Sequence, residues 1–141
     1  QLTAIRNFIQ QEVDYIVLAP VTETGWDTVL QEAKDAGIPV IIVDRMVDVS
    51  DDSLYTAWVG SNFKLEGQKA MAWLDAYLEA KGRGDEDINL VDIQGTIGAS
   101  AQIGRTEGFD EAVEAHDNWN TIAQQSGEFT QLKARKLWNL S

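Results

Sequence analysis

The sequence predicts an α/β fold in which parallel sheets are flanked by helices. Apolar β-type runs alternate with helical patterns along the whole 141-residue chain, an alternation that is typical of α/β proteins. The run Ile-Pro-Val-Ile-Ile-Val at residues 38–43 is uninterrupted, as expected for a strand buried on both faces of a parallel sheet. The connections between successive runs are short, which favours strand–helix–strand units with parallel strands and right-handed crossovers.

Residues 1–60 are expected to supply two helices and three strands. The expected elements are a helix at residues 1–11, a strand at 13–19, a helix between Gly25 and Gly37, a strand at 38–43 and a strand at 54–59. Ile5, Phe8 and Ile9 share one helical face by their spacing. Pro20 ends the first strand because proline cannot continue a central ladder, and Gly37 ends the second helix. The polar residues 44–53 form a loop whose acids lack the full spacing of a calcium loop.

Residues 61–141 continue the alternation. The expected elements are a long helix from Phe63 to the polar connector at Lys81, a strand at 88–93, a helix at 100–116, a weak strand at 121–125 and a last helix at 127–141. The expected buried stripe of the long helix consists of Phe63, Gly67, Ala70, Met71, Leu74 and Leu78. Trp73 and Tyr77 flank this stripe and are expected to pack in the core or at its edge.

Composition excludes several classes of function. The formal net charge of −12 argues against nucleic-acid binding, which requires clusters of basic residues to neutralise phosphates. The chain contains no cysteine, which excludes disulfides and thiolate metal sites. No apolar run approaches the roughly 20 residues that a membrane-spanning helix needs.

Asp44 and Arg45 are the first candidate site residues. They directly follow the apolar run at residues 38–43, and ligands of open α/β sheets bind beyond the carboxyl ends of such strands. The pair is therefore a candidate ligand-binding site. The alternative is a solvent-exposed ion pair or a turn cap, because surface pairs are common and weak.

Arg105 and Phe129 are the second and third candidates. Arg105 lies four positions before Phe109 on the expected inward face of its helix, near the helix start, where the dipole disfavours a cation. Its planar fork could hold two neighbouring hydroxyl groups of a polyol, although an arginine stem that covers the core is an alternative. Phe129 follows the strand at 121–125 and could lie under the C–H face of a sugar or pack in the core.

The sequence offers no catalytic constellation. The single histidine, His116, falls at a helix end where capping is its natural role, and Ser100 is expected to cap a helix start. The turn at residues 95–98 lacks the glycine spacing of a dinucleotide fingerprint and a Walker lysine, although its N–H groups could bind an oxygen-rich ligand. We therefore predict that the chain is not an enzyme and binds no cofactor and no metal.

Five motifs together resemble the pentose/hexose-type periplasmic sugar-binding proteins, the solute receptors of ABC importers. The motifs are Leu18-Ala19-Pro20-Val21, the run from Ile38 to Asp44-Arg45, Val59-Gly60-Ser61-Asn62 with Glu66-Gly67, the run from Gln94 to Ala101 with Arg105 and Gly108-Phe109, and Gln125-Ser126-Gly127-Glu128-Phe129. The ribose-binding proteins belong to this family, and the galactofuranose-binding members are most similar because they share the Ala-Pro-Val, Thr-Gly-Trp and Gln-Gly-Thr-x-Gly-Ala-Ser runs.

The resemblance implies a two-lobed fold that closes around a sugar. By this likeness Gly60, Ser61 and Asn62 form the first hinge crossing, residues 1–60 belong to the N-terminal lobe and residues 61–141 to the C-terminal lobe. Asp44 and Arg45 match the family's sugar-binding pair, Arg105 its second-lobe arginine and Phe129 its second-lobe aromatic. The resemblance also implies an internal fragment that is incomplete at both ends.

The expected partners are a monosaccharide, either a pentose or a hexose such as galactofuranose, and the membrane subunits of an ABC transporter, but no nucleic acid. The resemblance implies a periplasmic protein, or an extracellular lipid-anchored one in a Gram-positive cell. The effector-binding core of a LacI-type transcription regulator shares this fold and is the alternative function.

Overall fold

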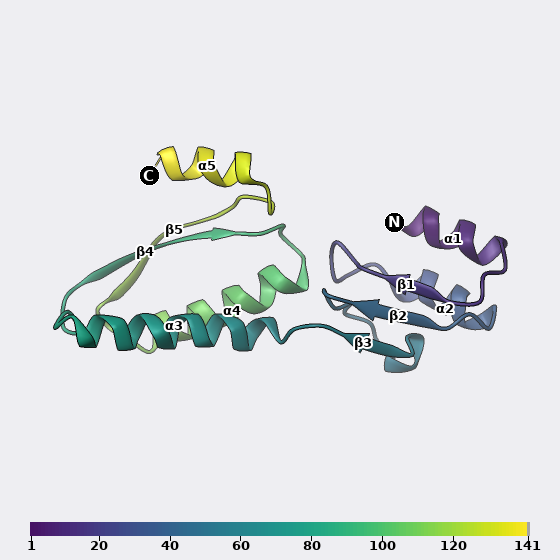
Figure 1. The fold of residues 1–141 in the computed structure, drawn as a ribbon, viewed down its shortest axis with the longest axis horizontal. Coiled ribbons are helices and arrows are strands. Elements are labelled where there is room, and N and C mark those ends of the chain that lie inside the picture. The colour runs from purple at the N-terminus through teal and green to yellow at the C-terminus, as the bar shows by residue number, and fades with distance from the viewer. Residues whose placement is uncertain (141) are drawn as a thin grey trace. The chain divides into compact units, whose positions relative to one another are not determined.

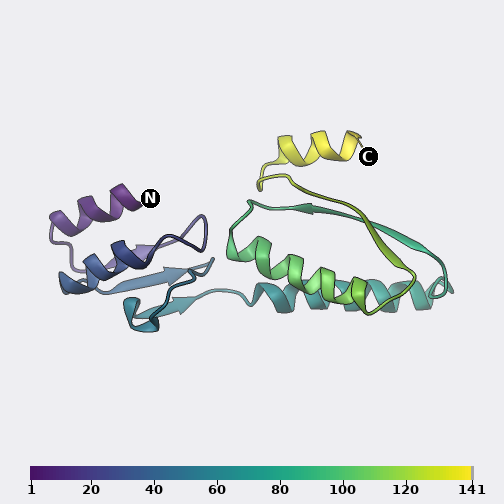
Figure 2. The same ribbon diagram turned by 180° about the vertical axis from the view of Figure 1, so that it is seen from behind.

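The computed structural model describes residues 1–140, and they form two compact units (Figures 1 and 2). Unit 1 comprises Gln1–Ser61 together with Gly98–Ser100, and unit 2 comprises Asn62–Ile97 and the chain from Ala101 onward. Both units combine helices with a parallel sheet. The predicted α/β class with parallel sheets flanked by helices is confirmed.

Unit 1 contains a sheet of three parallel strands. Its elements are α1 (Leu2–Gln10), β1 (Ile16–Leu18), α2 (Asp27–Asp35), β2 (Val40–Val43), the 3₁₀ helix η1 (Asp52–Leu54) and β3 (Ala57–Val59). The strand order is β1-β2-β3, with Ile16 beside Val40 and Ile42 beside Trp58. The carboxyl ends of the strands therefore lie at one edge, and the loop that follows β2 starts there.

The core of unit 1 lies on one face of this sheet. Val40 and Ile42 of β2 point into it and are fully buried, together with Leu30 of α2 and Ile5 of α1. Ile41 and the other outward residues of β2 are only half-buried. The prediction of a strand buried on both faces is therefore wrong for the described residues, because α1 and α2 both pack on the same face.

All three strands of unit 1 are shorter than the sequence pattern predicts. The strand predicted at 54–59 begins only at Ala57, because Leu54 is part of η1. The Asp51 side chain caps this turn by accepting a hydrogen bond from the Ser53 N–H at 2.8 Å. A local side-chain cap thus replaces the first rungs of the expected strand.

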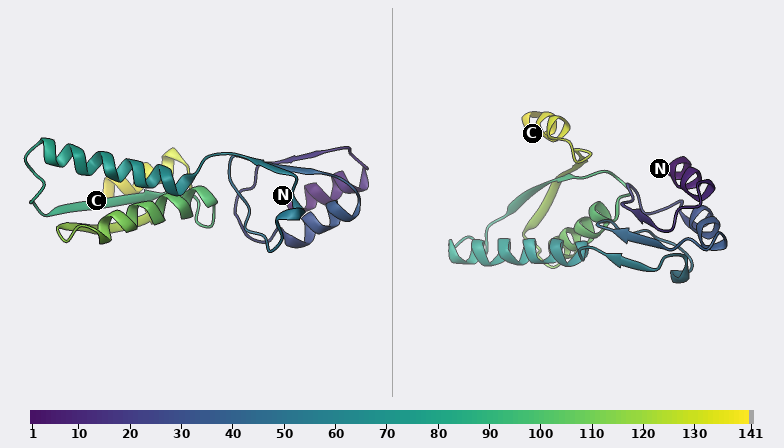
Figure 3. Two further views of the ribbon diagram at one scale, coloured as in Figure 1. Left: turned by 90° about the horizontal axis from the view of Figure 1, so that it is seen from below. Right: turned by 45° about the vertical axis from the view of Figure 1, so that its right-hand side comes forward.

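Unit 2 packs helices on both faces of a two-stranded parallel sheet (Figure 3). Its elements are α3 (Phe63–Ala80), β4 (Ile88–Gln94), α4 (Ser100–Glu114), β5 (Trp119–Ser126) and α5 (Gln131–Leu140). Helices α3 and α4 cover one face, and α5 lies over the other. The strand predicted as weak is the longest of the chain, since β5 pairs with the whole of β4. The last helix begins at Gln131, so Phe129 lies in the loop before it.

Helices α3 and α4 approach each other closely at glycines. A Cβ atom on Gly67 of α3 would lie 2.6 Å from the Arg105 carbonyl oxygen, and one on Gly108 of α4 would lie 2.6 Å from the Gln68 nitrogen. Gly104 makes a similar contact with the backbone of α3. The absence of side chains at these positions lets the two backbones touch, which fixes how the rest of each helix faces the other.

The buried stripe of α3 is only partly as predicted. Met71 and Leu78 are buried with Ile88 and Trp119, but Ala70 is exposed. Trp73 is 65% exposed and stacks on Tyr77 with 5.1 Å between the ring centroids. The core alternative for this pair is therefore wrong, because both side chains are exposed. None of the helices in residues 1–140 is long and apolar enough to cross a membrane.

Candidate functional site

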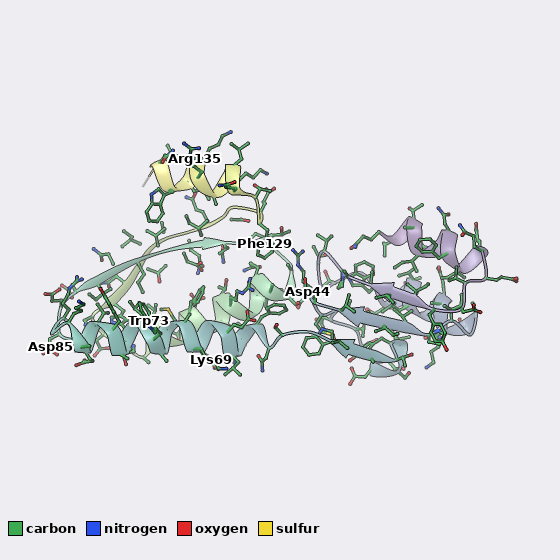
Figure 4. All side chains as sticks on the ribbon, in the orientation of Figure 1. Asp44, Lys69, Trp73, Asp85, Phe129 and Arg135 are labelled. Atoms are coloured by element: carbon green, nitrogen blue, oxygen red, sulfur yellow. The ribbon has the colours of Figure 1, made fainter. Side chains whose placement is uncertain are left out.

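The predicted site residues fall into two groups, one in each unit. Asp44 and Arg45 follow β2 in unit 1, whereas Arg105 on α4 and Phe129 after β5 belong to unit 2. Figure 4 labels Asp44 and Phe129, each of which lies where a strand gives way to a loop. Each group is built by different local interactions.

The backbone of Asp44 is held in an uncommon conformation. Its φ of 63° lies in the left-handed region, which costs a non-glycine residue about 1–2 kcal/mol. The Asp44 N–H donates to the Val59 carbonyl at 2.9 Å, and the Trp58 indole N–H donates to the Asp44 carbonyl at 3.2 Å. A side chain on Gly60 would collide with that same carbonyl. These contacts fix the backbone and leave the Asp44 side chain exposed at the sheet edge.

Arg45 turns toward the loop that follows β1. Its Nη1 donates to the Val21 carbonyl at 2.9 Å, and the side chain is half-buried. The same loop region is held by Gln1, whose side chain accepts from the Val21 N–H at 2.9 Å and donates to the Ala19 carbonyl at 2.8 Å. The two loops after the carboxyl ends of β1 and β2 are thereby tied together through Arg45.

Arg105 is held on α4 by three residues of α3. Its Nε and Nη2 each lie 3.1 Å from Glu66 Oε2. The guanidinium carbon lies 5.2 Å from the centre of the Phe63 ring, within the range of a cation–π contact. Gly67 brings the α3 backbone against Arg105 itself. Arg105 therefore does not simply cover the core, because its head group is oriented by a carboxylate and an aromatic ring.

Phe129 is positioned by a strained turn. Glu128 and Phe129 both have positive φ, 54° and 56°, a conformation that persists where surrounding contacts determine it. The Gly127 N–H donates to the Gln94 carbonyl at 2.7 Å, and the Ser126 hydroxyl donates to the Gly95 carbonyl at 2.6 Å. The Phe129 ring lies directly over Gly95, where a side chain would occupy its place. Phe129 is thus 46% exposed and not a core residue.

Arg105 and Phe129 line one pocket of about 320 Å³ in unit 2. The pocket is lined by Asp92, Ile93, Gln94, Gly95, Gln102, Arg105, Thr106, Gly127, Phe129, Thr130, Gln131 and Ala134. It lies at the carboxyl ends of β4 and β5, beside the start of α4 and the start of α5. A guanidinium, an aromatic ring and several amides therefore meet in a single concave site, which is a usual composition for a small-molecule pocket.

Two amides of this pocket share one hydroxyl group. Gln94 Nε2 donates to Thr106 Oγ1 at 2.9 Å, and Gln102 Nε2 donates to the same oxygen at 3.1 Å. Gln102 is only 9% exposed. The shared hydroxyl fixes the orientation of both amides, so the polar wall beside Arg105 is preorganised.

Asp92 adds a half-buried carboxylate to the same lining. Burial raises its pKa above the ordinary value, the hydrogen bond donated by Gln124 at 3.0 Å lowers it, and the nearby charge of Asp110 raises it further. The net direction is upward. Burial is therefore the dominant influence on this acid.

The predicted hinge residues have identifiable local roles. Asn62 Oδ1 accepts a hydrogen bond from the Leu65 N–H at 3.0 Å and caps α3. Gly60 allows the close approach of Asp44 and Trp58 described above. Ser61 is exposed between them. Their role as a hinge stays a prediction.

The structure tests one of the two predictions about helix ends. The Ser100 hydroxyl accepts a hydrogen bond from the Met46 N–H at 2.7 Å in the loop after β2, and its capping of α4 stays a prediction. His116 Nδ1 lies 2.7 Å from the Ala112 carbonyl in the last turn of α4, which confirms a capping role. The described residues contain no group of three or more acids or histidines that could hold a metal ion.

The sequence did not predict three residues at or beside this pocket, namely Glu66, Asp92 and Gln102. Glu66 stands in one of the quoted motifs and Gln102 within the helix of Arg105, but neither shows a contact partner in the sequence. The spacing Gly104-x-x-x-Gly108 was the available signal, because paired small residues on one helix face indicate a close helix crossing. Such a crossing places Arg105, the residue next to Gly104, against α3.

Comparison with known proteins gives consistent results. Residues 1–139 match the family described as periplasmic binding protein domain. The chain is 44% identical over 137 residues to the galactofuranose-binding protein YtfQ of Escherichia coli K12, an alignment that covers 97% of this chain and 42% of that protein. The resemblance inferred from the motifs is thereby confirmed.

Two solved structures are also similar to this chain in sequence and in fold. A Mycobacterium smegmatis protein in complex with β-D-fucofuranose matches with a TM-score of 0.90 and 40% identity, over 99% of this chain and 45% of that one. The periplasmic binding protein component of the arabinose ABC transporter from Shewanella sp. ANA-3, bound to α- and β-L-arabinofuranose, matches with a TM-score of 0.86 and 43% identity, over 96% and 43%. The chain spans less than half the length of each of these relatives.

Proposed function

Because the chain belongs to the periplasmic binding protein domain family, we propose that it is part of a receptor that binds a monosaccharide and delivers it to an ABC importer. The single observation that carries this proposal is the pocket that Arg105 and Phe129 share in unit 2. A planar guanidinium beside an aromatic ring suits a sugar, since the guanidinium donates to neighbouring hydroxyls and the ring covers a C–H face.

Asp44 and Arg45 of unit 1 bind the same monosaccharide in this proposal. Asp44 supplies acceptors for hydroxyl protons and Arg45 supplies donors, which complements Arg105. Residues 1–60 and 61–141 then act as parts of two lobes joined at Gly60, Ser61 and Asn62. Ligand contacts from both lobes favour the closed state, so that binding and closure are coupled.

The ligand is proposed to be a pentose or hexose in its furanose form. The three relatives described above are named for galactofuranose or were solved with fucofuranose or arabinofuranose. The proposed partners are the membrane subunits of an ABC transporter, and the proposed location is the periplasm, or the cell surface with a lipid anchor.

The receptor is favoured over the effector-binding core of a LacI-type regulator. The relatives compared above are a sugar-binding protein and the binding component of a transporter by name, and none of them is named as a regulator or an enzyme.

Titration calorimetry of the whole protein with arabinose, galactose, ribose, xylose and galactofuranose tests the proposal. We expect binding of at least one sugar and a loss of about 100-fold for Arg105→Ala, because two charge-assisted hydrogen bonds are removed. Arg135→Ala on the exposed face of α5 removes the same charge elsewhere and is expected to leave the affinity unchanged. Equal affinities of Arg105→Ala and wild type would contradict the assignment of Arg105.

A further inference from the structure

We infer that Glu66 determines specificity at the Arg105 pocket: it positions the guanidinium and cancels its charge, so that the pocket accepts uncharged polyols and rejects sugar acids. This inference rests on the proposed function, because it concerns which sugars the same pocket admits. Glu66 lies on α3, outside the pocket lining, and acts through Arg105.

The geometry around Arg105 leaves its side chain few alternatives. Glu66 Oε2 accepts a hydrogen bond from Nε at 3.1 Å and forms an ion pair with Nη2 at the same distance, and the Phe63 ring lies beneath the guanidinium. Gly67 brings the α3 backbone into contact with the backbone of Arg105. The anchoring residues all lie in the first turns of α3, and Asn62 caps that helix. The head group is therefore held on its Nε side by the Glu66 carboxylate.

The contact with Glu66 determines which N–H groups of Arg105 remain available to a ligand. Glu66 accepts the Nε–H and lies 3.1 Å from Nη2, along the side edge of the fork. The N–H groups that remain point from the Nη1 and Nη2 end. An end-on fork of this kind donates to two adjacent hydroxyl oxygens, or equally well to a carboxylate. Hydrogen-bond geometry alone thus does not separate a neutral sugar from a sugar acid.

Charge is what separates the two ligand classes. Among the described residues that line the pocket, the charged side chains are Arg105 and Asp92. Glu66 pairs with Arg105 at hydrogen-bond distance, so the remaining unbalanced charge is the Asp92 carboxylate. Within the unit 2 lining a sugar acid would meet a negative charge and no unmatched cation, and like charges brought together disfavour binding. An uncharged polyol meets no such penalty.

A purely structural role for Glu66 makes a different prediction. The Arg105 and Glu66 side chains are 40% and 42% exposed, and exposed ion pairs contribute little to folding stability. A structural role would change the affinity for every ligand by the same factor. A positioning and charge-balancing role changes the ratio between neutral and acidic ligands.

The test is Glu66→Gln in the whole protein, titrated with D-galactose and D-galacturonate, which differ by a carboxylate at one carbon. We expect wild type to prefer galactose strongly. In Glu66→Gln we expect the galacturonate-to-galactose affinity ratio to rise by about 10-fold or more, since one net positive charge is gained beside the ligand. The matched control is Glu111→Gln, which removes the Lys64–Glu111 ion pair of 2.7 Å between the same two helices and is expected to leave the ratio unchanged.

A second measurement reports on Arg105 without any sugar. The ¹H–¹⁵N signal of the Arg105 Nε–H, assigned by its absence in Arg105→Lys, is expected to exchange slowly in wild type and to shift and broaden in Glu66→Gln. An unchanged signal together with an unchanged affinity ratio overturns the inference. If wild type binds none of the sugars while the signal behaves as expected, the proposed function fails and the positioning of Arg105 by Glu66 stands.

Discussion

Unit 1 and unit 2 position their candidate ligand residues by different means. In unit 1 a continuous apolar core holds the sheet, with Leu30 and Ile42 at 0% exposure. Asp44 is then placed at the end of β2 by a backbone hydrogen bond to Val59 and by the Trp58 indole N–H, which donates to its carbonyl. Its position therefore depends on β3, the neighbouring strand of the sheet.

Unit 2 has a smaller buried cluster and places its residues through side chains. The cluster consists of Met71, Leu78, Ile88 and Trp119, surrounded by partly buried residues. Glu66 and Phe63 orient Arg105. The comparison teaches that single substitutions should disturb the unit 1 site mainly by unfolding it, whereas they can retune the unit 2 site in a folded protein.

The largest expected effect is on the core of unit 1. Leu30→Ala should lower the free energy of unfolding by about 2–5 kcal/mol, because a fully buried leucine leaves a cavity. Leu78→Ala in unit 2 should lower the free energy of unfolding by about 2 kcal/mol, since its partly exposed neighbours can collapse into the space. Hydrogen exchange measured by mass spectrometry reports both units separately. Equal losses of unfolding free energy in the two variants would show that the two cores do not differ in this way.

The second effect concerns the crossing of α3 and α4. Gly108→Ala should destabilise unit 2 by about 1–3 kcal/mol, because its Cβ would lie 2.6 Å from the Gln68 nitrogen. Helix propensity alone predicts the opposite sign, a gain of about 1 kcal/mol. Ala70→Gly on the exposed side of α3 serves as the control for propensity. A stabilised Gly108→Ala protein would show that the crossing is looser than the structure indicates.

The third effect compares two glycines beside site residues. Gly60→Ala would meet the Asp44 backbone, whereas Gly95→Ala would meet only the outer end of the Phe129 ring. We expect Gly60→Ala to reduce stability more, because backbone cannot move aside. We expect Gly95→Ala to fold normally but to bind sugar about 10-fold more weakly, as the ring is displaced. Thermal unfolding and calorimetry together separate the two outcomes.

The smallest expected effect is a difference between the two units in how their folding stability depends on pH. Hydrogen bonds from the Ser50 N–H and hydroxyl lower the pKa of Asp27 in unit 1 below its model-compound value of 3.8. This contribution is therefore present above pH 3.8 and is lost as the pH falls through the lowered pKa. Burial raises the pKa of Asp92 in unit 2, so the folded state binds the extra proton and unit 2 gains stability as the pH falls toward 3.8.

Hydrogen exchange at several pH values below neutral checks these opposite signs. Asp27→Asn should reduce the loss of folding stability that unit 1 shows as the pH falls. Asp92→Asn should reduce the gain of folding stability that unit 2 shows over the same pH range. If both units lose stability in parallel as the pH falls, the assignment of Asp92 as a carboxylate disfavoured by burial is wrong.

Most elements could be predicted from sequence periodicity. The apolar run at residues 38–43 and the stripe of Met71 and Leu78 reflect local patterns, and local patterns are visible in one dimension. Element ends were predicted less well. Leu54 is a β-type apolar residue that entered η1 because Asp51 capped the turn, and β5 extended to Trp119 because β4 offered a partner along its whole length.

The sequence by itself determined the α/β class, the family resemblance and the candidates Asp44, Arg45, Arg105 and Phe129. Each of these follows from residue types in a short stretch or from motifs along the chain. Only the tertiary structure decided how the side chains are used. It paired Arg105 with Glu66, laid Phe129 over Gly95 and gathered Asp92 and Gln102 into the same pocket. The physical reason is that these contacts join residues distant in sequence. The crossing of α3 and α4 at three glycines brings Glu66 to Arg105, and the pairing of β4 with β5 brings Phe129 to Gly95.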